Sequence, residues 1–419
     1  MHEILTEIWA TARRNKLRTA LTGFSVAWGI FMLIFLLGAG NGLINAQMQS
    51  SDRYLANSMK AYGGHTSMPY DGLDKGRQIR LNELDMATTR TVFGHVVDEL
   101  TAVYRQAGIT LTLGGEYMAD QSITGVYPDD ARINKRELVA GRYVNDIDMR
   151  ERRKVMVLSD DQARELTRGR GQAVGRHVLA DGLAWLVVGV YKGDGMGRAN
   201  EAFAPYTAVR AIYNNGDRVG NIEFSFSGLA TEEQNLDFEA DYRAKLNLNH
   251  RAHPADGSTV WLWNRFMDNI QMARGIGILR TALWVVGLLT LLSGIVGVSN
   301  IMLITVRERT REFGIRKAIG AKPWAILRLI IVESVVITTV FGYIGMVCGI
   351  AANEWMNATI GRTEVDTGLF RATMFVNPTV GIDVCIEATL VMVLAGTLAG
   401  IVPARRAARV RPIEALKEC

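Results

Sequence analysis

The sequence predicts a multi-pass α-helical membrane protein with four transmembrane helices and a large α+β domain outside the membrane, between the first and second helices. Three features of the 419-residue chain support this prediction. Four runs are each long and apolar enough to span a membrane, which takes about 20 residues. Basic residues gather beside several of these runs, and one long polar block separates the first run from the second.

The four apolar runs are expected to be membrane helices. Glycine is frequent in all of them, and small residues let membrane helices approach closely. The alternative, buried helices of a soluble protein, would require the chain to hide four such runs at once. We therefore expect transmembrane segments at residues 19–45, 276–306, 325–352 and 381–404.

The distribution of charge gives the orientation, because short cytoplasmic loops are enriched in Lys and Arg. Segments 1–18, 307–328 and 405–419 together hold sixteen basic and six acidic residues. Loop 353–378, in contrast, holds two basic and three acidic residues. Both termini and the loop between the second and third spans are therefore expected in the cytoplasm. The rest of the chain carries −5, so the overall charge of +5 reflects membrane topology and argues against nucleic acid as a partner.

This orientation assigns the remaining segments. We expect a cytoplasmic amphipathic helix at 1–18, an external domain at 46–275, a cytoplasmic helix at 307–324, an external loop at 353–380 and a cytoplasmic tail at 405–419. The apolar stretch Ala20–Ala39 is longer than the core of a cleaved signal peptide, about 7–15 residues. We expect an uncleaved anchor, with a cleaved signal as the alternative.

The polar block at 46–275 predicts an α+β domain. Its strand-like runs, rich in β-branched and aromatic residues, are Ile109–Leu113, Lys154–Leu158, Trp185–Tyr191, Ile222–Ser227 and Thr259–Trp263. Leu81–Gln106 has apolar residues at helical spacing and predicts a helix.

No catalytic or metal site is predicted in this block. It contains none of the three cysteines, so it offers neither a disulfide framework nor a Cys-based zinc site. His250 and His253 are three residues apart and could share a helical face, but no further ligands accompany them. We expect these histidines to be surface or structural residues. Trp261 and Trp263 are expected to serve packing of the external domain or the stalk junction, and not ligand stacking.

The first two spans are predicted to extend beyond the membrane. No proline lies between Pro254 and Pro323, and helical spacing runs from about Asn264 to Thr305. A helix of that length would measure about 60 Å, twice the hydrocarbon thickness. Apolar positions beyond Gly42 continue the first helix in the same way. Both helices are expected to form an outward stalk; the alternative is that they stop at the membrane surface.

The cytoplasmic segment between the second and third spans predicts a short charged helix. Glu312 and Arg316 form a favourable i,i+4 pair, and Gly320 followed by Pro323 is a helix stop. An apolar face would come from Phe313, Ile315, Ala318 and Ile319. Such a helix could dock in a groove of a partner ATPase; a solvated basic loop is the alternative.

Here a resemblance becomes specific. Ser299–Leu303 followed by Arg307–Ala321 resembles the membrane-domain motif of the MacB/FtsX-type ABC transporter permeases. Further segments that resemble the family's pattern are Arg13–Thr22, Gly141–Tyr143, Val155–Leu158, Val174–Arg176, Leu186–Val190 and Gly400–Leu416. The resemblance is strongest from the second span onward and weaker between Met59 and Ile133. Arg411 departs from the acidic residue or asparagine that is more usual before Pro412.

The resemblance implies a dimeric permease whose external block is a MacB-like periplasmic core domain. It assigns coupling to the ATPase to Glu308, Arg309, Thr310, Arg311, Glu312, Phe313, Gly314, Arg316, Lys317, Ala318 and Gly320. Glu333 stands where the family has a glutamate early in its third span, and a structural hydrogen bond or ion pair to a neighbouring helix is its expected role. A carboxylate within a span is otherwise a functional flag, and a proton pathway is the alternative.

The same resemblance implies partners and a location. The sequence contains no Gly-x-x-x-x-Gly-Lys-Ser/Thr motif, so ATP and Mg²⁺ are expected on a partner ABC ATPase, with no cofactor or catalytic activity on this chain. The second permease would be another copy or a paralogue, in the bacterial inner membrane. A periplasmic adaptor and an outer-membrane channel are further expected partners in the case of efflux.

Three functions remain open at this point. The first is an efflux or extrusion permease of the MacB kind. The second is a regulator like FtsX, which transmits ATP-driven motion to a periplasmic cell-wall hydrolase. The third is a lipoprotein-release permease, which shares the architecture. A membrane-anchored periplasmic enzyme is the least favoured alternative, because no nucleophile–base or carboxylate-pair arrangement stands out.

Overall fold

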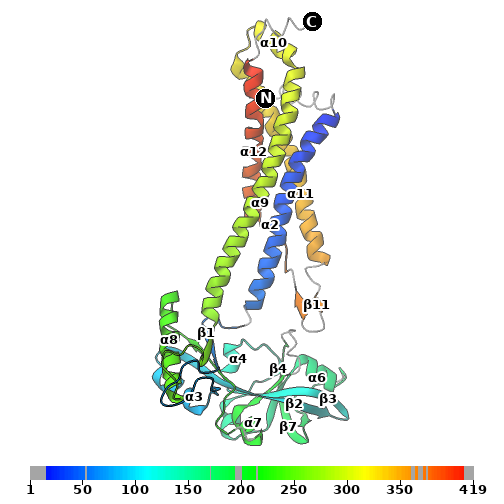
Figure 1. Ribbon diagram of the computed structural model, residues 1–419. Helices are drawn as coiled ribbons and strands as arrows, with labels where there is room; N and C mark the ends of the chain where they lie inside the picture. Colours follow the sequence, from blue (N-terminus) through cyan, green and yellow to red (C-terminus); the bar gives the residue numbers. More distant parts are fainter. Residues whose placement is uncertain are drawn as a thin grey trace. The chain divides into compact units, whose positions relative to one another are not determined.

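Long apolar helices occupy all four expected spans (Figure 1). In the part of the chain that the structure describes, these are α2 (Lys16–Ser51), α9 (Arg265–Glu308), α11 (Pro323–Thr359) and α12 (Ile382–Arg409). Each contains a segment with a mean hydropathy of 2.1 or 2.2 and is long enough to cross a membrane. The predicted four-span architecture is therefore confirmed.

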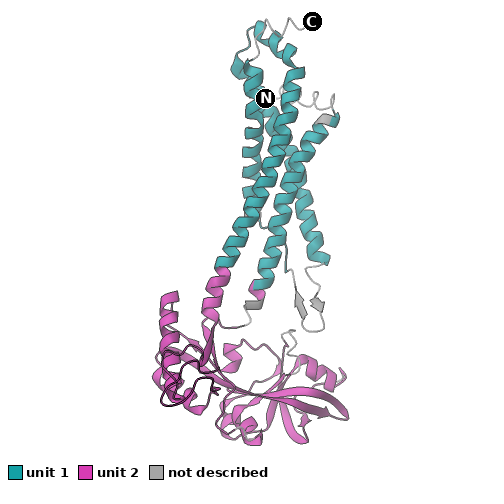
Figure 2. Cartoon of the chain, viewed as in Figure 1, with its two compact units in different colours: residues 1–47, 274–364, 373–419 teal, residues 48–273, 365–372 magenta. Residues whose placement is uncertain are grey.

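The computed structural model describes residues 16–51, 54–169, 171–193, 201–213, 216–359, 364–366, 371–373 and 376–409. The chain divides into two units (Figure 2), which we call the membrane unit (residues 1–47, 274–364 and 373–419) and the β-rich unit (residues 48–273 and 365–372). The expected amphipathic helix at 1–18 lies outside the described residues, except for residues 16–18, which begin α2.

The two helices that flank the polar block are longer than a bilayer requires. α9 has 44 residues and α2 has 36, which correspond to about 66 Å and 54 Å of helix against a hydrocarbon thickness of about 30 Å. The helix expected from Asn264 to Thr305 is α9, which no proline interrupts. Between α9 and α11, the short helix α10 (Thr310–Ala318) occupies the charged segment.

Small residues bring the membrane helices into close contact. A Cβ atom added at Gly345 of α11 would overlap the carbonyl oxygen of Ala27 in α2. One added at Gly294 of α9 would lie 2.8 Å from the carbonyl oxygen of Ser25. Interhelical hydrogen bonds accompany this packing: Ser334 Oγ donates to the Gly396 carbonyl of α12 at 2.9 Å. The glycines expected to permit close approach do so in the structure.

The β-rich unit is built on one ten-stranded sheet. Its strands are β1 (Ser58–Gly63), β2 (Val97–Leu113), β3 (Glu116–Val126), β4 (Leu138–Gly141), β5 (Val155–Ser159), β6 (His177–Ala180), β7 (Leu183–Tyr191), β8 (Glu201–Pro205), β9 (Asn221–Phe226) and β10 (Val260–Asn264). Their order is β10-β1-β9-β2-β3-β8-β5-β7-β4, and β6 pairs with β2 and β7. A separate pair joins β11 (Glu364–Asp366) to β12 (Arg371–Thr373).

Strand β2 belongs to both halves of this sheet. Its first part, Val97–Val103, pairs with β9, and its second part, Tyr104–Leu113, pairs with β3. The register shifts between Ala107 and Ile109, where Gly108 has a φ of +76°; a bulge of this kind bends the strand. Each half has an apolar core of its own, one around Phe224 and the other around Trp185.

Short helices cover the two halves of the sheet. They are α3 (Glu83–Val92), α4 (Asp130–Ile133), α5 (Asp146–Arg150), α6 (Asp160–Leu166), α7 (Tyr206–Tyr213) and α8 (Glu232–Asn249). Helices α3 and α8 contact each other in the half that contains β1, β9 and β10, whereas α6 and α7 pack on β3 in the other half. Capping boxes begin α3, α5, α6 and α8.

All five predicted strands are present, in β2, β5, β7, β9 and β10, and the α+β prediction is confirmed. The helix predicted over Leu81–Gln106 is correct only as far as Val92 and wrong beyond it, because Val97 begins β2. Gly94 lies in the turn that ends the helix. The β-branched residues that follow, Val96, Val97 and Val103, favour a strand, and pairing with β9 stabilises it.

The helix contacts give a first prediction. We expect Gly345→Ala to destabilise the membrane unit by about 1–3 kcal/mol, because the added methyl group overlaps the α2 backbone. Gly277→Ala is the matched control, since a Cβ atom there meets nothing within 4 Å in the same kind of helix. Thermal unfolding in detergent measures the effect. Equal unfolding temperatures for the two variants would contradict the packing described here.

Candidate functional site

Helix α10 and its flanking residues contain nearly all the positions predicted for coupling to an ATPase. α9 ends at Glu308 and Arg309 caps the start of α10. The hydroxyl of Thr310 donates back to the Arg307 carbonyl of α9 at 2.7 Å, which holds the turn between the helices. At the other end, Gly320 adopts a φ of +100°, the left-handed conformation that commonly ends a helix. The predicted helix and its stop are thus both present.

Arg309 is the centre of the polar contacts at the start of α10. Its Nε and Nη2 donate to the two carboxylate oxygens of Glu312 at 2.8 and 3.0 Å, a bidentate geometry. Glu312 Oε1 also accepts from Arg316 Nη2 at 2.9 Å, which is the i,i+4 pair read from the sequence. The Arg309 guanidinium further lies 5.5 Å from the centre of the Phe313 ring.

The same arginine connects α10 to the third span. Arg309 Nη1 lies 3.7 Å from Glu333 Oε2, and only 8% of the Glu333 side chain is exposed. Glu333 lies in the first third of α11 (Pro323–Thr359), the part of this helix that follows α10 most closely along the chain. The ion pair to a neighbouring element expected of Glu333 is therefore present, with Arg309 as its partner.

Two more contacts attach α10 to the membrane unit. Phe313 is 1% exposed and packs in the same apolar cluster as Val306 and Ile330. Lys317 Nζ donates to the Ala408 carbonyl of α12 at 2.6 Å. Gly314, beside Phe313, is also buried. Helix α10 is therefore held to α11 through Arg309 and to α12 through Lys317.

The apolar face expected on α10 is divided in the structure. Phe313 points into the membrane unit, whereas Ile315 is 41% exposed and Ile319 is 82% exposed. Ala318 and Arg311 are exposed as well, and Trp324 at the start of α11 is 70% exposed. These side chains therefore lie outside the apolar core of the membrane unit that encloses Phe313.

Glu308, the first of the predicted coupling residues, is exposed at the end of α9, outside α10. The structure thus brings Arg309, Glu312, Arg316 and Glu333 into one polar group. It separates Phe313 and Gly314, which face inward, from Arg311 and Ala318, which face outward.

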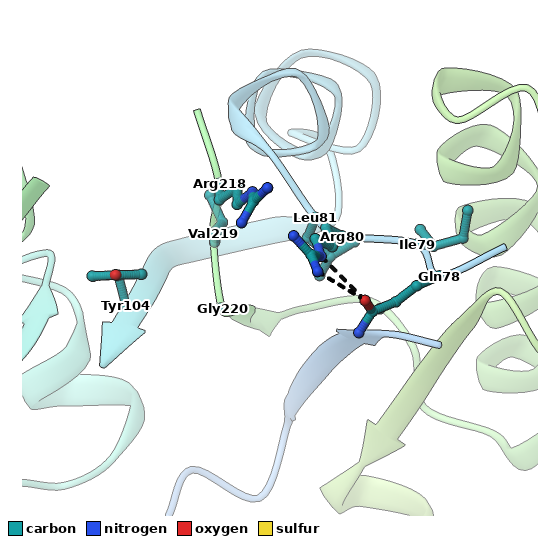
Figure 3. A pocket seen from close by; sticks show the side chains of 9 residues that line it. Gln78, Ile79, Arg80, Leu81, Tyr104, Arg218, Val219 and Gly220 are labelled. Atoms are coloured by element: carbon teal, nitrogen blue, oxygen red, sulfur yellow. Dashed lines mark hydrogen bonds between the residues drawn. The ribbon is translucent and has the colours of Figure 1, made fainter. Parts of the chain in front are cut away.

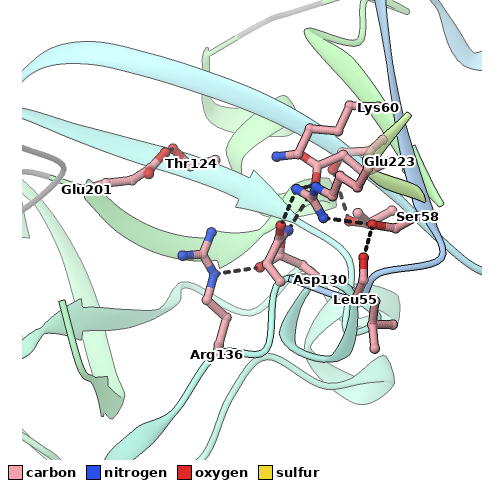
Figure 4. A network of polar contacts seen from close by, with 12 residues as sticks. Leu55, Ser58, Lys60, Thr124, Asp130, Arg136, Glu201 and Glu223 are labelled. Carbon is pink, nitrogen blue, oxygen red and sulfur yellow. Dashed lines mark hydrogen bonds and ion pairs between the residues drawn. The ribbon is translucent and has the colours of Figure 1, made fainter. Parts of the chain in front are cut away.

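A buried polar group in the β-rich unit was not found from the sequence (Figure 4). Its centre is Glu223 of β9, 2% exposed, whose Oε1 lies 2.7 Å from Lys60 Nζ of β1. Glu223 Oε2 accepts from Asn134 Nδ2 at 2.9 Å. The sequence does contain a signal, because Lys60 and Glu223 each interrupt an apolar strand with a charge of opposite sign. We call the group the Glu223 cluster, made of Ser58, Lys60, Asp130, Asn134, Glu223 and Arg265.

The β-rich unit also has an open pocket with a volume of about 290 Å³ (Figure 3). Backbone of Gly63 and Gly220 forms part of its wall, and Tyr104, Arg80 and Arg218 contribute side chains. Arg80 donates through Nε and Nη2 to Gln78 Oε1 at 3.2 and 3.1 Å. Guanidinium groups recognise carboxylates and phosphates, so the lining suits an anionic group.

The histidines and tryptophans singled out in the sequence have structural contacts. His250 lies just after the end of α8, and its Nε2 is 2.7 Å from Asp85 Oδ2. His253 lies outside the helix, so the two histidines do not share a helical face. The rings of Trp261 and Tyr62 lie 5.3 Å apart. Among the described residues, no group of three or more His, Cys, Asp or Glu side chains could hold a metal ion.

The Glu312 contacts predict a dependence on pH. Hydrogen bonds from Arg309 lower the pKa of Glu312 from its ordinary value of 4.5. A carboxyl whose pKa is lower in the folded protein stabilises the fold above the unfolded pKa and loses this contribution as the pH falls through the folded pKa. Because 40% of the side chain is exposed, screening limits the effect to under about 1 kcal/mol.

We therefore expect α10 of the native protein to be better protected from hydrogen exchange than α10 of Glu312→Gln at pH 7. The difference should disappear as the pH falls below about 4.5. Exchange measured by mass spectrometry and corrected for intrinsic rates tests this. Glu151→Gln, which breaks an exposed ion pair with Arg153, is the control. Equal protection of α10 in native protein and Glu312→Gln at pH 7 would count against the Glu312 contacts.

Two protein-family models match most of the chain. Residues 19–236 match the MacB-like periplasmic core domain, and residues 284–412 match the FtsX-like permease C-terminal domain. The ABC transporter permease YknZ of Bacillus subtilis, described as uncharacterized, is 28% identical over 96% of each chain. The macrolide export ATP-binding/permease protein MacB of Shewanella oneidensis is 26% identical over 96% of this chain and 58% of its own length.

The pyoverdine export ATP-binding/permease protein PvdT of Pseudomonas savastanoi is 27% identical, and the chain spans 58% of its length. Among solved structures, the periplasmic region of MacB from Actinobacillus actinomycetemcomitans matches 54% of this chain and 95% of its own, with 17% identity and a TM-score of 0.43. The extracellular domain of YknZ matches 50% of this chain and 100% of its own, with 18% identity and a TM-score of 0.40. With the core-domain match covering half of its length, the chain belongs to the MacB/FtsX-type ABC transporter permeases.

Proposed function

We propose that the chain is the permease subunit of a MacB-type ABC transporter that exports a substrate. ATP hydrolysis by a separate nucleotide-binding subunit would drive motion of the periplasmic core domain and extrusion of the substrate. The observation that carries this proposal is the pairing of the MacB-like core domain with the FtsX-like permease domain in one chain. The printed names of the MacB and PvdT relatives describe export of macrolides and of pyoverdine.

Placement of the ATPase on another subunit is supported by the 419 residues themselves, which contain no P-loop motif. The chain spans 58% of the MacB and PvdT relatives, whose names describe ATP-binding and permease functions together, and 96% of the permease YknZ. ATP and Mg²⁺ would accordingly bind the partner ATPase.

Helix α10 is the proposed contact with that ATPase. Its exposed face combines apolar Ile315 with charged Arg311, and Ile319 follows directly. The inward contacts of Arg309, Phe313 and Lys317 attach the helix to α11 and α12. A displacement of α10 by the ATPase would therefore act on two membrane helices.

The further partners and the location belong to the same proposal. Two permeases, either two copies or this chain and a paralogue, would form the dimer. The chain would lie in the bacterial inner membrane with both termini in the cytoplasm, as the excess of basic residues favours. A periplasmic adaptor and an outer-membrane channel would complete the export route.

Mass spectrometry of the proteins that co-purify with the tagged chain from its native membrane tests the proposal. An ATPase with an adaptor and an outer-membrane channel is the expected result. An ATPase with a cell-wall hydrolase and no channel would replace the proposal with the FtsX-like regulatory function, and an ATPase with a lipoprotein carrier would replace it with lipoprotein release.

Substitutions in α10 test the coupling itself. We expect Ala318→Pro, Glu312→Lys and Arg316→Glu to uncouple ATP hydrolysis from the activity of the complex while the permease stays inserted. Proline in a helix costs about 3 kcal/mol, and either charge reversal opposes the Glu312–Arg316 pair. The ATPase rate and the extrusion activity are measured with the partner ATPase in vesicles.

Ala318→Ser is the matched control, because it replaces the same exposed residue without removing a backbone N–H. It should behave as the native chain does. Normal ATPase-dependent activity in all three variants would exclude α10 as the coupling helix.

A further inference from the structure

The Glu223 cluster places several charged side chains in the interior of the periplasmic core domain. Lys60 is 6% exposed, Arg265 is 4% exposed and Asp130 is 1% exposed. Burial lowers the pKa of Lys60, and the adjacent Glu223 carboxylate offsets part of this shift. Burying charge carries a large desolvation cost, so the cluster calls for an explanation other than stability.

The sheet register explains why these side chains meet. Lys60 of β1 is directly opposite Glu223 of β9 on one side and Trp263 of β10 on the other. Residues opposite each other in adjacent strands point to the same face. The cluster is therefore fixed by the pairing of the first strand of the domain with its last two strands along the chain.

Arg265 connects the cluster to both ends of the domain. It is the first residue of α9, the helix that continues as the second membrane span. Its Nη1 donates to Ser58 Oγ at 2.9 Å, and its guanidinium carbon lies 3.9 Å from the centre of the Tyr54 ring. Tyr54 and Ser58 lie in the segment that follows α2, the first span. Arg265 thus contacts the segment that follows the first span, and it is also the first residue of the helix that forms the second span.

The same arginine is attached to the interior of the domain. Arg265 Nη2 donates to Asn134 Oδ1 at 3.0 Å and lies 3.9 Å from Glu223 Oε2. Asn134 Nδ2 in turn donates to Asp130 Oδ1 at 2.8 Å, and the hydroxyl of Tyr143 donates to Asp130 Oδ2 at 2.6 Å. Tyr143 belongs to the Gly141–Tyr143 motif, which begins at the last residue of β4, the strand at the far edge of the sheet from β10. A continuous path of polar contacts therefore leads from Arg265 across the domain.

The cluster is also not optimised for stability. Within the described part of the chain, Arg265 Nε is buried without a hydrogen-bond partner, and an unmade hydrogen bond of a buried donor costs about 1–3 kcal/mol. Apolar residues of similar volume often stabilise a fold as well as a buried ion pair does. Hydrogen bonds and ion pairs are directional, whereas apolar packing is not. The polar contacts of the cluster therefore determine which of its atoms move together.

We propose that the Glu223 cluster is the joint through which movement of α2 and α9 enters the periplasmic core domain, with Arg265 and Glu223 as positioning residues of the transport cycle. This inference rests on the proposed ATP-driven function. A pull or rotation at the start of α9 acts on Arg265, and its bonds carry the displacement to β9 and α4. Stacking on Tyr54 makes the segment after α2 follow the same displacement.

The test uses the full chain in complex with its partner ATPase. Hydrogen exchange by mass spectrometry is compared without nucleotide and with ATP plus vanadate. The main variant is Lys60→Met/Glu223→Leu/Arg265→Met, which replaces the charges by apolar residues and should unfold within about 5 °C of the native protein. In the native complex we expect nucleotide to change exchange in α10 and in strands β5 and β7, which contain none of the substitutions.

In the variant, the change in α10 should remain and the change in β5 and β7 should be lost. The matched control is Asp71→Leu/Arg251→Met, which removes an exposed ion pair of the same unit, with an Nε–Oδ2 distance of 2.6 Å. This control should retain both changes. If nucleotide changes hydrogen exchange in β5 and β7 of the triple variant as it does in the native complex, the proposed role of the Glu223 cluster is wrong.

The outcomes separate this inference from the proposed function. If nucleotide changes nothing in α10 of the native complex, the proposed coupling fails, and the joint fails with it. If α10 responds but β5 and β7 of the native complex do not, only the joint is overturned.

If the triple variant does not fold, the experiment uses the single variant Arg265→Lys instead. This variant keeps the positive charge but cannot bond Ser58 and Asn134 at once, as the planar guanidinium does. The response of β5 and β7 should then be reduced while that of α10 stays. An unchanged response in folded Arg265→Lys would contradict the role of Arg265.

Discussion

Close contact between α2 and α11 is the constraint on which the membrane unit depends. Gly345 lets the two backbones meet beside Ala27, and Gly38 leaves room for the side chain of Asn353. Asn353 Nδ2 then donates to the Ile34 carbonyl of α2 at 3.0 Å. A polar side chain in hydrocarbon needs such a partner, and the partner is within reach only because no Cβ atom separates the helices. The position of α11 also sets the position of Glu333, and through Arg309 that of α10.

Helix α10 is attached to the membrane helices on one side and exposed on the other. Its inward contacts combine one buried aromatic ring, one ion pair and one hydrogen bond from a lysine to a helix carbonyl. None of these contacts uses Ile315, Arg311 or Ala318, which remain exposed. Attachment to the membrane helices and the proposed contact with the ATPase therefore involve different residues of the same short helix.

The membrane helices, five strands and α10 could be predicted because their signals are local. An apolar run, an alternating strand or an i,i+4 pair lies within a few residues of sequence. The error beyond Val92 arose where helical and strand spacing overlap, and pairing with β9 decided the outcome. The charges of Lys60 and Glu223 within apolar strands are a signal of the Glu223 cluster, but its membership could not be predicted. Lys60, Asn134 and Arg265 are far apart in sequence and meet only in the folded domain. The split between Phe313 and Ile315 likewise depends on the orientation of α10 against α11.

The pairing of β1 with β10 has a consequence for how the protein is made. These are the first and last strands of the core domain, and Met59 of β1 pairs with Asn264 of β10. During synthesis, the first strand emerges about 200 residues before its partner, so β1 lacks that partner until nearly the whole domain has been secreted. Unpaired strand edges favour aggregation, and the domain contains no cysteine that a disulfide could use to hold an intermediate. The sheet can therefore close at this edge only after the last strand of the domain has joined the first.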